Sequence, residues 1–178
     1  MSNIGKLTIQ VPQNVMVNFD SKNSTLQIKG LLGELTRTLK NGFKLNLSSL
    51  EETKSFTISS SNKKLWGTEN THIQNMIQGV TYGFRKDLKL IGIGYRARLE
   101  EKKLILKVGY THDVSFNIPE GILIQCPKPD QITVFGIEKE LVHKTSFQIR
   151  SIKKPDIYKG KGIRFDNEII RLKEGKKK

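Results

Sequence analysis

The chain of 178 residues has few of the residues that build disulfides, metal centres or membrane spans. Its single cysteine, Cys126, excludes an internal disulfide and has no C-x-x-C companion with which to hold zinc. No stretch approaches the roughly 18 apolar residues of a membrane-spanning helix. The N-terminus lacks a secretory signal core and an Arg- and Ser-rich leader pattern. We therefore expect a protein that acts where it is made, unless a leader was removed beforehand.

Acidic residues are also scarce. Asp and Glu number 17 against 31 Lys and Arg, so the formal net charge is +14. A surplus of this size favours a polyanionic partner, either nucleic acid or an anionic membrane surface. The surplus is uneven, because residues 150–178 hold eleven basic and four acidic residues, a net charge of +7. The polyanion is therefore expected to bind at the C-terminal end.

No arrangement of residues in the sequence is typical of catalysis. The three histidines stand singly, and a lone cysteine is typical of a small buried hydrophobe. The stretch Y-K-G-K-G-I-R-F (158–165) invites comparison with a nucleotide-binding loop. Such a loop needs G-x-x-x-x-G-K-[ST] at the start of a helix, whereas this stretch follows a predicted helix and has no Lys-Ser or Lys-Thr pair. We expect no enzyme, no cofactor, no metal and no small-molecule substrate.

Similar segments occur twice in the chain and predict two copies of one α+β unit. The segment I-Q-V-P-Q-N-V-M-V around Pro12 resembles F-N-I-P-E-G-I-L-I around Pro119, 107 residues later. Gly30 and Gly136 end two further alternating segments, 106 residues apart. Alternation predicts strands, and an apolar stripe at helical spacing follows in each copy. The expected fold is α+β, with two tandem copies of a small antiparallel or mixed sheet packed with a helix.

The repeat predicts two domains. The first is expected over 1–88, with an extra strand pair at about 41–60 that the second copy lacks. The second is expected over 89–178 and includes the basic C-terminal tail. The glycine turn around Gly94 is interpreted as the first-copy counterpart of the turn around Gly162. On this interpretation the turn belongs to the fold, and the second copy adds charge to it.

The basic stretch suits the phosphate backbone of a nucleic acid. Lysine supplies a compact charge, arginine can fork onto a phosphate, and glycine allows the chain to approach a ligand closely. Tyr158 and Phe165 either stack on an exposed base or pack back on the sheet. The lysines either contact RNA or form a solvated turn. The tail over 173–178 has too little apolar content to fold alone, so we expect it to become ordered on a polyanion.

Long motifs give the chain a family resemblance. P-D-I-Y-K-G-K-G-I-R-F, followed by E-I-I-R-L-K-E-G-K-K-K, closely resembles the C-terminal signature of the ribosomal protein L-six family of the large subunit. W-G-T, N-M-I-Q-G-V-T-Y-G-F, L-K-L-I-G-I-G-Y-R-A-R, V-G-Y-T-H-D-V and I-P-E-G-I match that family in order, so the resemblance covers essentially the whole chain. It implies two tandem RNA-binding α+β units, no catalytic role, and large-subunit rRNA and neighbouring ribosomal proteins as partners. It also implies docking near the sarcin–ricin loop and the translation-factor site.

The resemblance and the charge together name the candidate RNA-binding residues. Those carried over from the family motif are Tyr158, Lys159, Gly160, Lys161, Gly162, Arg164, Lys173, Lys176, Lys177 and Lys178. Three more, at the exit of the second helix, are added on charge grounds: Arg150, Lys153 and Lys154.

The chain also departs from the usual family motifs. K-G-L-L-G replaces K-G-P-L-G, and P-D-I-Y replaces P-E-P-Y. These departures, with a composition rich in Lys, Asn and Ile, favour an organelle-encoded ribosomal protein, mitochondrial rather than plastid, with a bacterial cytoplasm as the alternative.

Overall fold

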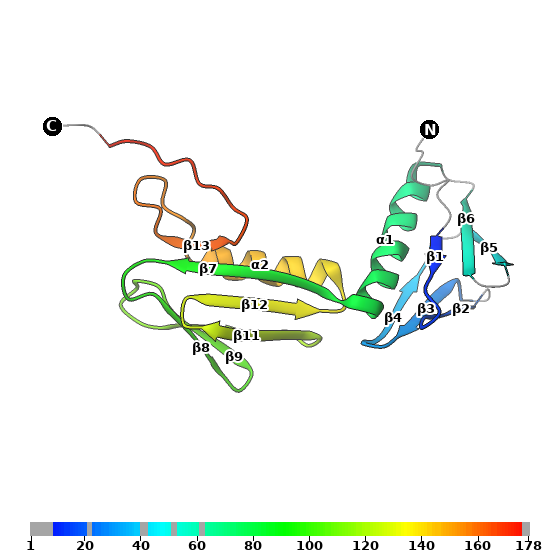
Figure 1. The fold of residues 1–178 in the computed structure, drawn as a ribbon, viewed down its shortest axis with the longest axis horizontal. Helices are drawn as coiled ribbons and strands as arrows, with labels where there is room; N and C mark the ends of the chain where they lie inside the picture. The colour runs from blue at the N-terminus through cyan, green and yellow to red at the C-terminus, as the bar shows by residue number, and fades with distance from the viewer. Residues whose placement is uncertain (1–8, 21–22, 40–42, 51–52, 61–62, 176–178) are drawn as a thin grey trace. The chain divides into compact units, whose positions relative to one another are not determined.

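A computed structural model describes residues 9–20, 23–39, 43–50, 53–60 and 63–175 of the chain. The chain divides into unit 1, which comprises Met1–Gly83 and Ile137–Lys139, and unit 2, which comprises Phe84–Gly136 and Glu140–Lys178. Each unit contains one helix and antiparallel sheets (Figure 1). The α+β fold class predicted from the sequence is therefore confirmed. Within the described residues, no helix is both long enough and apolar enough to cross a membrane.

The described residues of unit 1 form six strands followed by a helix. Its elements are β1 (Ile9–Val11), β2 (Met16–Asp20), β3 (Thr25–Gly30), β4 (Gly33–Thr38), β5 (Phe43–Leu50), β6 (Thr53–Ser60) and α1 (Lys63–Tyr82). They form the antiparallel sheets β2-β3-β4 and β1-β6-β5. The side chains of Leu26 and Ile28 in β3 point to the same face of the strand, because every second residue of a strand does so. They share a core with Ile73, Ile77 and Val80, which helical spacing places on one face of α1.

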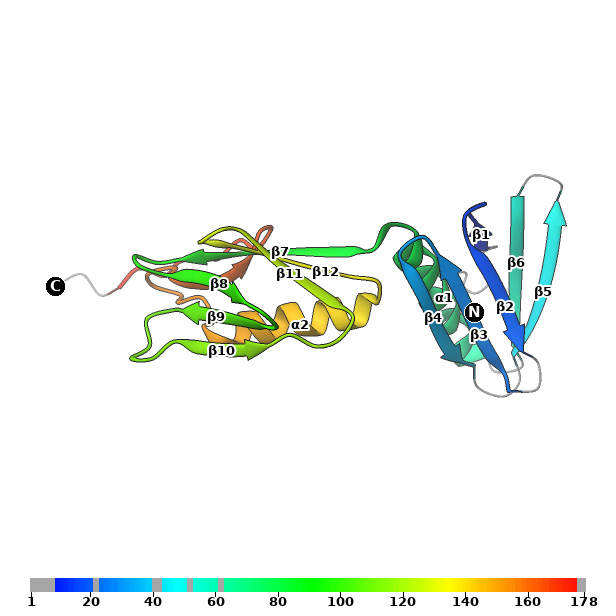
Figure 2. The same cartoon turned by 90° about the horizontal axis from the view of Figure 1, so that it is seen from below.

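Unit 2 repeats this arrangement and adds one strand. Its elements are β7 (Phe84–Ile91), β8 (Arg96–Glu100), β9 (Lys103–Lys107), β10 (Val114–Asn117), β11 (Ile122–Lys128), β12 (Gln131–Gly136), α2 (Lys139–Ile152) and β13 (Gly162–Phe165). They form the antiparallel sheets β10-β9-β8 and β11-β12-β7-β13 (Figure 2). Leu88, Ile132 and Ile163 from the four-stranded sheet are fully buried together with Val142 and Ile149 of α2.

The two units have the same topology in the same chain order. The pairings β2-β3-β4 and β1-β6-β5 of unit 1 correspond to β8-β9-β10 and β7-β12-β11 of unit 2, and α1 corresponds to α2. The strand that begins at Met16 thus corresponds to the strand that begins at Arg96, not to a segment 107 residues later. The equivalences of Pro12 with Pro119 and of Gly30 with Gly136 are therefore wrong. Short alternations joined by a Pro turn recur locally, and only strand pairing shows which ones correspond.

The correct correspondence changes two further expectations. Strands β5 and β6 occupy the expected extra pair at about 41–60, but β11 and β12 are their counterparts, so the pair is not confined to the first unit. The turns around Gly94 and Gly162 are not copies of each other either. Both belong to unit 2, where Gly162 of β13 lies opposite Ile91 of β7 in antiparallel register. The two glycine turns are therefore neighbours at one end of one sheet.

The division between the units also differs from the expected boundary between residues 88 and 89. That position lies inside β7, which pairs with β12 from Phe84 to Lys89. Because the hydrogen bonds of β7 are made to strands of unit 2, the division falls at Gly83 instead. A glycine with φ of 73° after the last residue of α1 ends that helix in the way typical of a left-handed C-cap.

Candidate nucleic-acid interface

The stretch from Tyr158 to Phe165 comprises the end of the loop that follows α2 and the whole of the edge strand β13. Its loop is closed by backbone hydrogen bonds: Asp156 N donates to Lys161 O at 2.9 Å, and Ile163 N donates to Lys153 O at 2.8 Å. The Asp156 carboxylate also accepts hydrogen bonds from the backbone N–H groups of Tyr158 (3.1 Å) and Lys159 (3.3 Å). An Asp that binds the N–H two residues on stabilises a tight turn. The loop conformation is thus set without a ligand.

Gly162 is required by the packing of this loop. Its φ is 145°, and a Cβ on it would lie 2.7 Å from Lys154 O and 2.7 Å from Pro155 Cα. Gly160 has φ of 69°, with Leu172 Cδ2 3.4 Å from its Cβ position. Side-chain bulk at Gly162 is therefore excluded by the chain's own backbone. The absence of a side chain at this predicted site residue allows the start of β13 to approach the backbone of Lys154 and Pro155, just beyond α2.

The loop places four of the predicted contacts on the surface. Tyr158 is 61 % exposed, and Lys154, Lys159 and Lys161 are exposed as well. The segment after β13 returns to this loop, because Lys173 N donates to Ile157 O at 3.0 Å. We define the basic surface as the exposed side chains of Lys154, Lys159, Lys161, Arg171 and Lys173.

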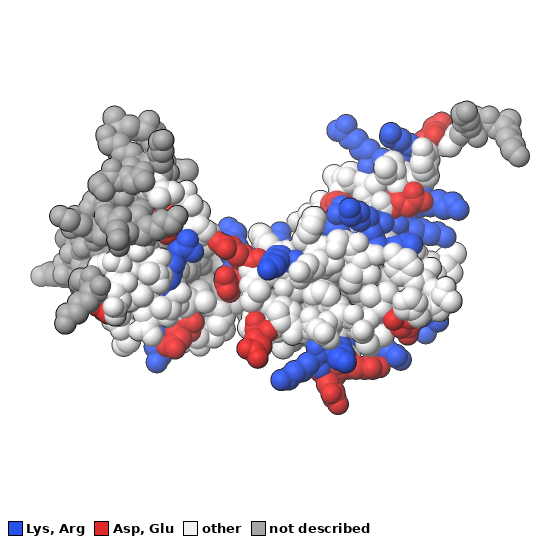
Figure 3. All heavy atoms as spheres, turned by 180° about the vertical axis from the view of Figure 1, so that it is seen from behind, with Lys and Arg blue, Asp and Glu red and all other residues white. Residues whose placement is uncertain are grey.

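The basic surface has an unneutralised positive charge. None of its five cations forms an ion pair with an acid in the part of the chain that the structure describes. Figure 3 shows Lys and Arg gathered at the end of unit 2 from which the C-terminal segment leaves. Arg171 was not among the residues predicted from the sequence, although its charge was counted there. The predicted contacts Lys176, Lys177 and Lys178 lie outside the described residues.

Lys153 and Tyr110 form a contact that the sequence did not predict. Lys153 Nζ lies 4.5 Å from the centroid of the Tyr110 ring, and Tyr110 Oη donates a hydrogen bond to Ile152 O at 2.8 Å. A cation above an aromatic face is stabilised by the ring quadrupole. Tyr110 lies 42 residues before Ile152, so only the fold brings it to the C-terminal end of α2. Tyr110 thus holds Lys153 beside the basic surface.

Arg150 is engaged inside the protein. From the last turn of α2 its Nε donates to Glu168 Oε2 at 2.8 Å, and its Nη2 donates to Oε1 of the same carboxylate. The side chains are only 21 % and 24 % exposed. Hydrogen bonding to Glu168 raises the pKa of Arg150, and hydrogen bonding from Arg150 lowers the pKa of Glu168. The charge-assisted fork leaves little of the Arg150 cation for a phosphate.

The last two residues of Y-K-G-K-G-I-R-F, Arg164 and Phe165, belong to β13 and are half-buried. Phe165 contacts the core, with Arg150 Cζ 5.8 Å and Lys86 Nζ 6.0 Å from its ring centroid. Of the two alternatives for Phe165, the structure therefore shows packing on the sheet. Arg164 is half-buried, and no described group accepts a hydrogen bond from its buried Nε.

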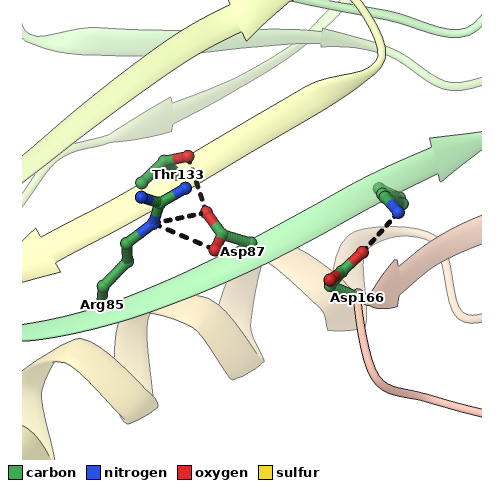
Figure 4. A network of polar contacts seen from close by, with 5 residues as sticks. Arg85, Asp87, Thr133 and Asp166 are labelled. Carbon is green, nitrogen blue, oxygen red and sulfur yellow. Dashed lines mark hydrogen bonds and ion pairs between the residues drawn. The ribbon is translucent and has the colours of Figure 1, made fainter.

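The solvent-facing side of the four-stranded sheet also carries charged residues, of which Arg85 and Lys89 are paired with carboxylates. Arg85 Nε donates to both Asp87 oxygens at 3.0 Å, and Thr133 Oγ1 donates to Asp87 Oδ1 at 2.7 Å (Figure 4). Lys89 forms an ion pair with Asp166. Because these cations already face carboxylates, this face offers a polyanion less than the basic surface does.

We expect the ion pair of Arg150 and Glu168 to make stability depend on pH. Since the folded pKa of Glu168 is lowered from its ordinary value of about 4.3, the contribution is fully present above that value and is lost as pH falls through the folded pKa. Wild type should therefore exceed Glu168→Gln in free energy of unfolding by a constant amount from pH 7 to about pH 5. Urea unfolding followed by circular dichroism measures this difference, and a gap that persists unchanged at about pH 2 would contradict it.

The histidine, cysteine and acidic side chains were also compared with the requirements of a metal site. Within the described residues, no group of three or more His, Cys, Asp or Glu side chains could hold a metal ion. Burial raises the pKa of the Cys126 thiol, which keeps it protonated, as suits a half-buried core contact.

Comparison with known proteins decides the family. The sequence model described as Ribosomal protein L6 matches residues 11–83 and 91–166, so it matches twice, once in each unit. The chain belongs to the ribosomal protein L6 family. The resemblance found in the sequence motifs is thereby confirmed, and the repeat in the family match agrees with the β1–β6–α1 and β7–β12–α2 correspondence of the fold.

Relatives of this ribosomal protein L6 family member match it over nearly their whole length. The large ribosomal subunit protein uL6 of Staphylococcus carnosus is 44 % identical and is aligned over 99 % of this chain and 98 % of its own. The uL6 of Mesoplasma florum is 43 % identical over the same shares. The uL6m of Reclinomonas americana is 39 % identical over the full length of both chains. These relatives are ribosomal proteins from both bacterial and mitochondrial sources, and none has an enzyme name.

Proposed function

We propose that this protein is a structural component of the large ribosomal subunit and binds large-subunit rRNA through the basic surface of unit 2. The observation that carries the proposal is the set of five exposed, unpaired cations on one loop and the adjoining C-terminal segment. Lysine and arginine that neutralise phosphates release condensed counterions, and this release dominates affinity for nucleic acids. Membership in a family of large-subunit proteins makes rRNA the polyanion that the surface would meet.

We propose different parts for the predicted site residues. Lys154, Lys159, Lys161 and Lys173 would contact phosphates, and Tyr158 would stack on an exposed base. Lys176, Lys177 and Lys178 would extend this contact along the RNA. Gly160 and Gly162 would act by shaping the loop. The family resemblance further supports docking near the sarcin–ricin loop and the translation-factor site, with neighbouring large-subunit proteins as additional partners.

Sucrose-gradient sedimentation of a tagged copy tests this function. We expect the tagged protein to co-sediment with large subunits at low salt and to be released as the salt concentration rises, because each phosphate contact adds to the salt dependence of binding. Crosslinking from Tyr158 should then recover large-subunit rRNA. A protein that stays at the top of the gradient, or that sediments with other RNAs, would contradict the ribosomal assignment and favour a free-standing RNA-binding regulator.

A further inference from the structure

A side chain of α2, Arg150, contacts the turn that begins the C-terminal segment. Glu168 lies three residues beyond β13, where its Oε2 accepts hydrogen bonds from Arg150 Nε at 2.8 Å and from Phe165 N at 3.2 Å. The backbone of the same turn is closed by Glu168 N, which donates to Phe165 O at 3.0 Å. A single carboxylate therefore ties the end of β13, the turn after it and the end of α2 together.

The direction of the chain after Glu168 decides where two cations of the basic surface lie. Lys173 N donates to Ile157 O, and Leu172 lies near Gly160, so the segment runs back along the loop that carries Lys159 and Lys161. Ile169 is 92 % exposed and Leu172 is 60 % exposed, so burial of apolar side chains contributes little to holding this segment. The turn at Glu168 is joined to the rest of unit 2 by the half-buried fork from Arg150, by the ion pair of Asp166 with Lys89 and by the hydrogen bond from Asp166 N to Asp87 O at 3.1 Å.

We propose that Arg150 and Glu168 are positioning residues for RNA binding, which together hold Arg171 and Lys173 beside Lys159 and Lys161, and that Arg150 is not itself a phosphate contact. This inference rests on the proposed function, because it concerns how the RNA-binding surface is assembled. It reassigns Arg150, which charge alone had placed among the RNA contacts. It also gives an acidic residue a favourable part in binding a polyanion.

Coulomb's law and the positioning role predict opposite changes in RNA affinity for the variant Glu168→Gln. Removal of a negative charge near a polyanion strengthens binding if charge alone matters. If Glu168 holds the segment, its neutralisation frees Arg171 and Lys173 to move, and RNA binding must then restrict them again. We expect affinity for a transcript of large-subunit rRNA to fall about tenfold in Glu168→Gln.

Glu174→Gln is the matched control, because it removes the same charge from the same exposed segment without touching the fork. We expect it to raise affinity slightly, about twofold. Filter binding of the full-length chain over a range of KCl concentrations gives both affinity and salt slope. If Glu168→Gln raises affinity as Glu174→Gln does, the positioning role is overturned.

Variants of Arg150 separate positioning from direct contact. We expect Arg150→Gln to lose about as much affinity as Glu168→Gln while it keeps the wild-type salt slope, and the double variant to lose no more than either single one. Arg150→Lys should bind almost as weakly as Arg150→Gln, because an ammonium group cannot form the fork. Two results would show instead that Arg150 contacts a phosphate. One is a salt slope lowered by about one in Arg150→Gln. The other is a double variant that binds like wild type, because the lost positive charge and the lost negative charge would then cancel.

Amide hydrogen exchange of the free protein tests, without RNA, whether the fork holds the C-terminal segment in place. The Lys173 N–H, which is bonded to Ile157 O, should lose protection in Glu168→Gln and Arg150→Gln and keep it in Glu174→Gln. Unchanged protection would overturn the proposal, whatever the RNA does. The proposed function would be overturned if the wild-type chain did not prefer large-subunit rRNA over an unrelated transcript of equal length. In that case, loss of Lys173 N–H protection in the two variants would still show that the fork holds the segment.

Discussion

Replacement of Lys154, Lys159 and Lys161 together by glutamine is expected to weaken binding to large-subunit rRNA on the order of a hundredfold at about 0.1 M salt. The three side chains are exposed on one loop and are unpaired among the described residues. Each lost phosphate contact should lower the slope of log affinity against log salt by about 0.7 to 0.9. The fold should be retained, because the loop is held by backbone hydrogen bonds and by Asp156.

A matched control removes the same charge elsewhere in unit 2. Lys102, Lys103 and Lys107 are also exposed and belong to the β8–β9 hairpin. Their replacement by glutamine lowers the net charge equally, so only a diffuse electrostatic effect should remain. Equal losses of affinity and equal changes of salt slope in the two triple variants would contradict the location of the interface. Filter binding over a salt series measures both quantities.

Replacement of Gly162 by alanine is expected to destabilise unit 2 by about 3 kcal/mol or more. Two effects add at this position. A φ of 145° is a conformation that L-residues rarely adopt, and the new Cβ would lie 2.7 Å from two backbone atoms that cannot rotate away. The shift needed to relieve this contact would also displace β13, and with it Ile163, which is fully buried. Urea unfolding followed by circular dichroism measures the loss.

Gly94→Ala is the control that isolates the steric contact. Gly94 also has a positive φ, 77°, but nothing lies within 4 Å of its Cβ position. Conformational strain alone should therefore cost about 1 kcal/mol there. If the two variants lose the same stability, the close approach of β13 to residues 154 and 155 is not what requires a glycine at position 162. Gly175→Ala, which has neither feature, should have no effect on stability.

Some features of the fold and site were predictable because they follow from local patterns. Alternation gathers Leu26 and Ile28 on one face of a strand, and helical spacing does the same for Ile73 and Ile77. The uneven charge likewise indicated the basic end of the chain, because residues that are close in sequence remain close in space. Lys159 and Lys161 were found in this way, and both are exposed.

Other features were not predictable, because they depend on contacts between residues far apart in sequence. The correspondence of the two units follows from strand pairing, so Pro12 and Pro119 matched in local pattern without matching in topology. Tyr110 lies 42 residues from the helix end it contacts, and no motif joins the two. Arg150 has the same charge as Lys159, and only the position of Glu168 shows that it is engaged inside the protein.

The sequence by itself determined the family, the α+β class and the basic character of the C-terminal end, because motif order, periodicity and charge are properties of the chain alone. The tertiary structure decided which basic residues are available to a partner. Charge is carried by the residue, but its availability depends on the groups that surround it. In this protein a carboxylate eighteen residues beyond Arg150 engages that cation, whereas the lysines of the loop remain exposed.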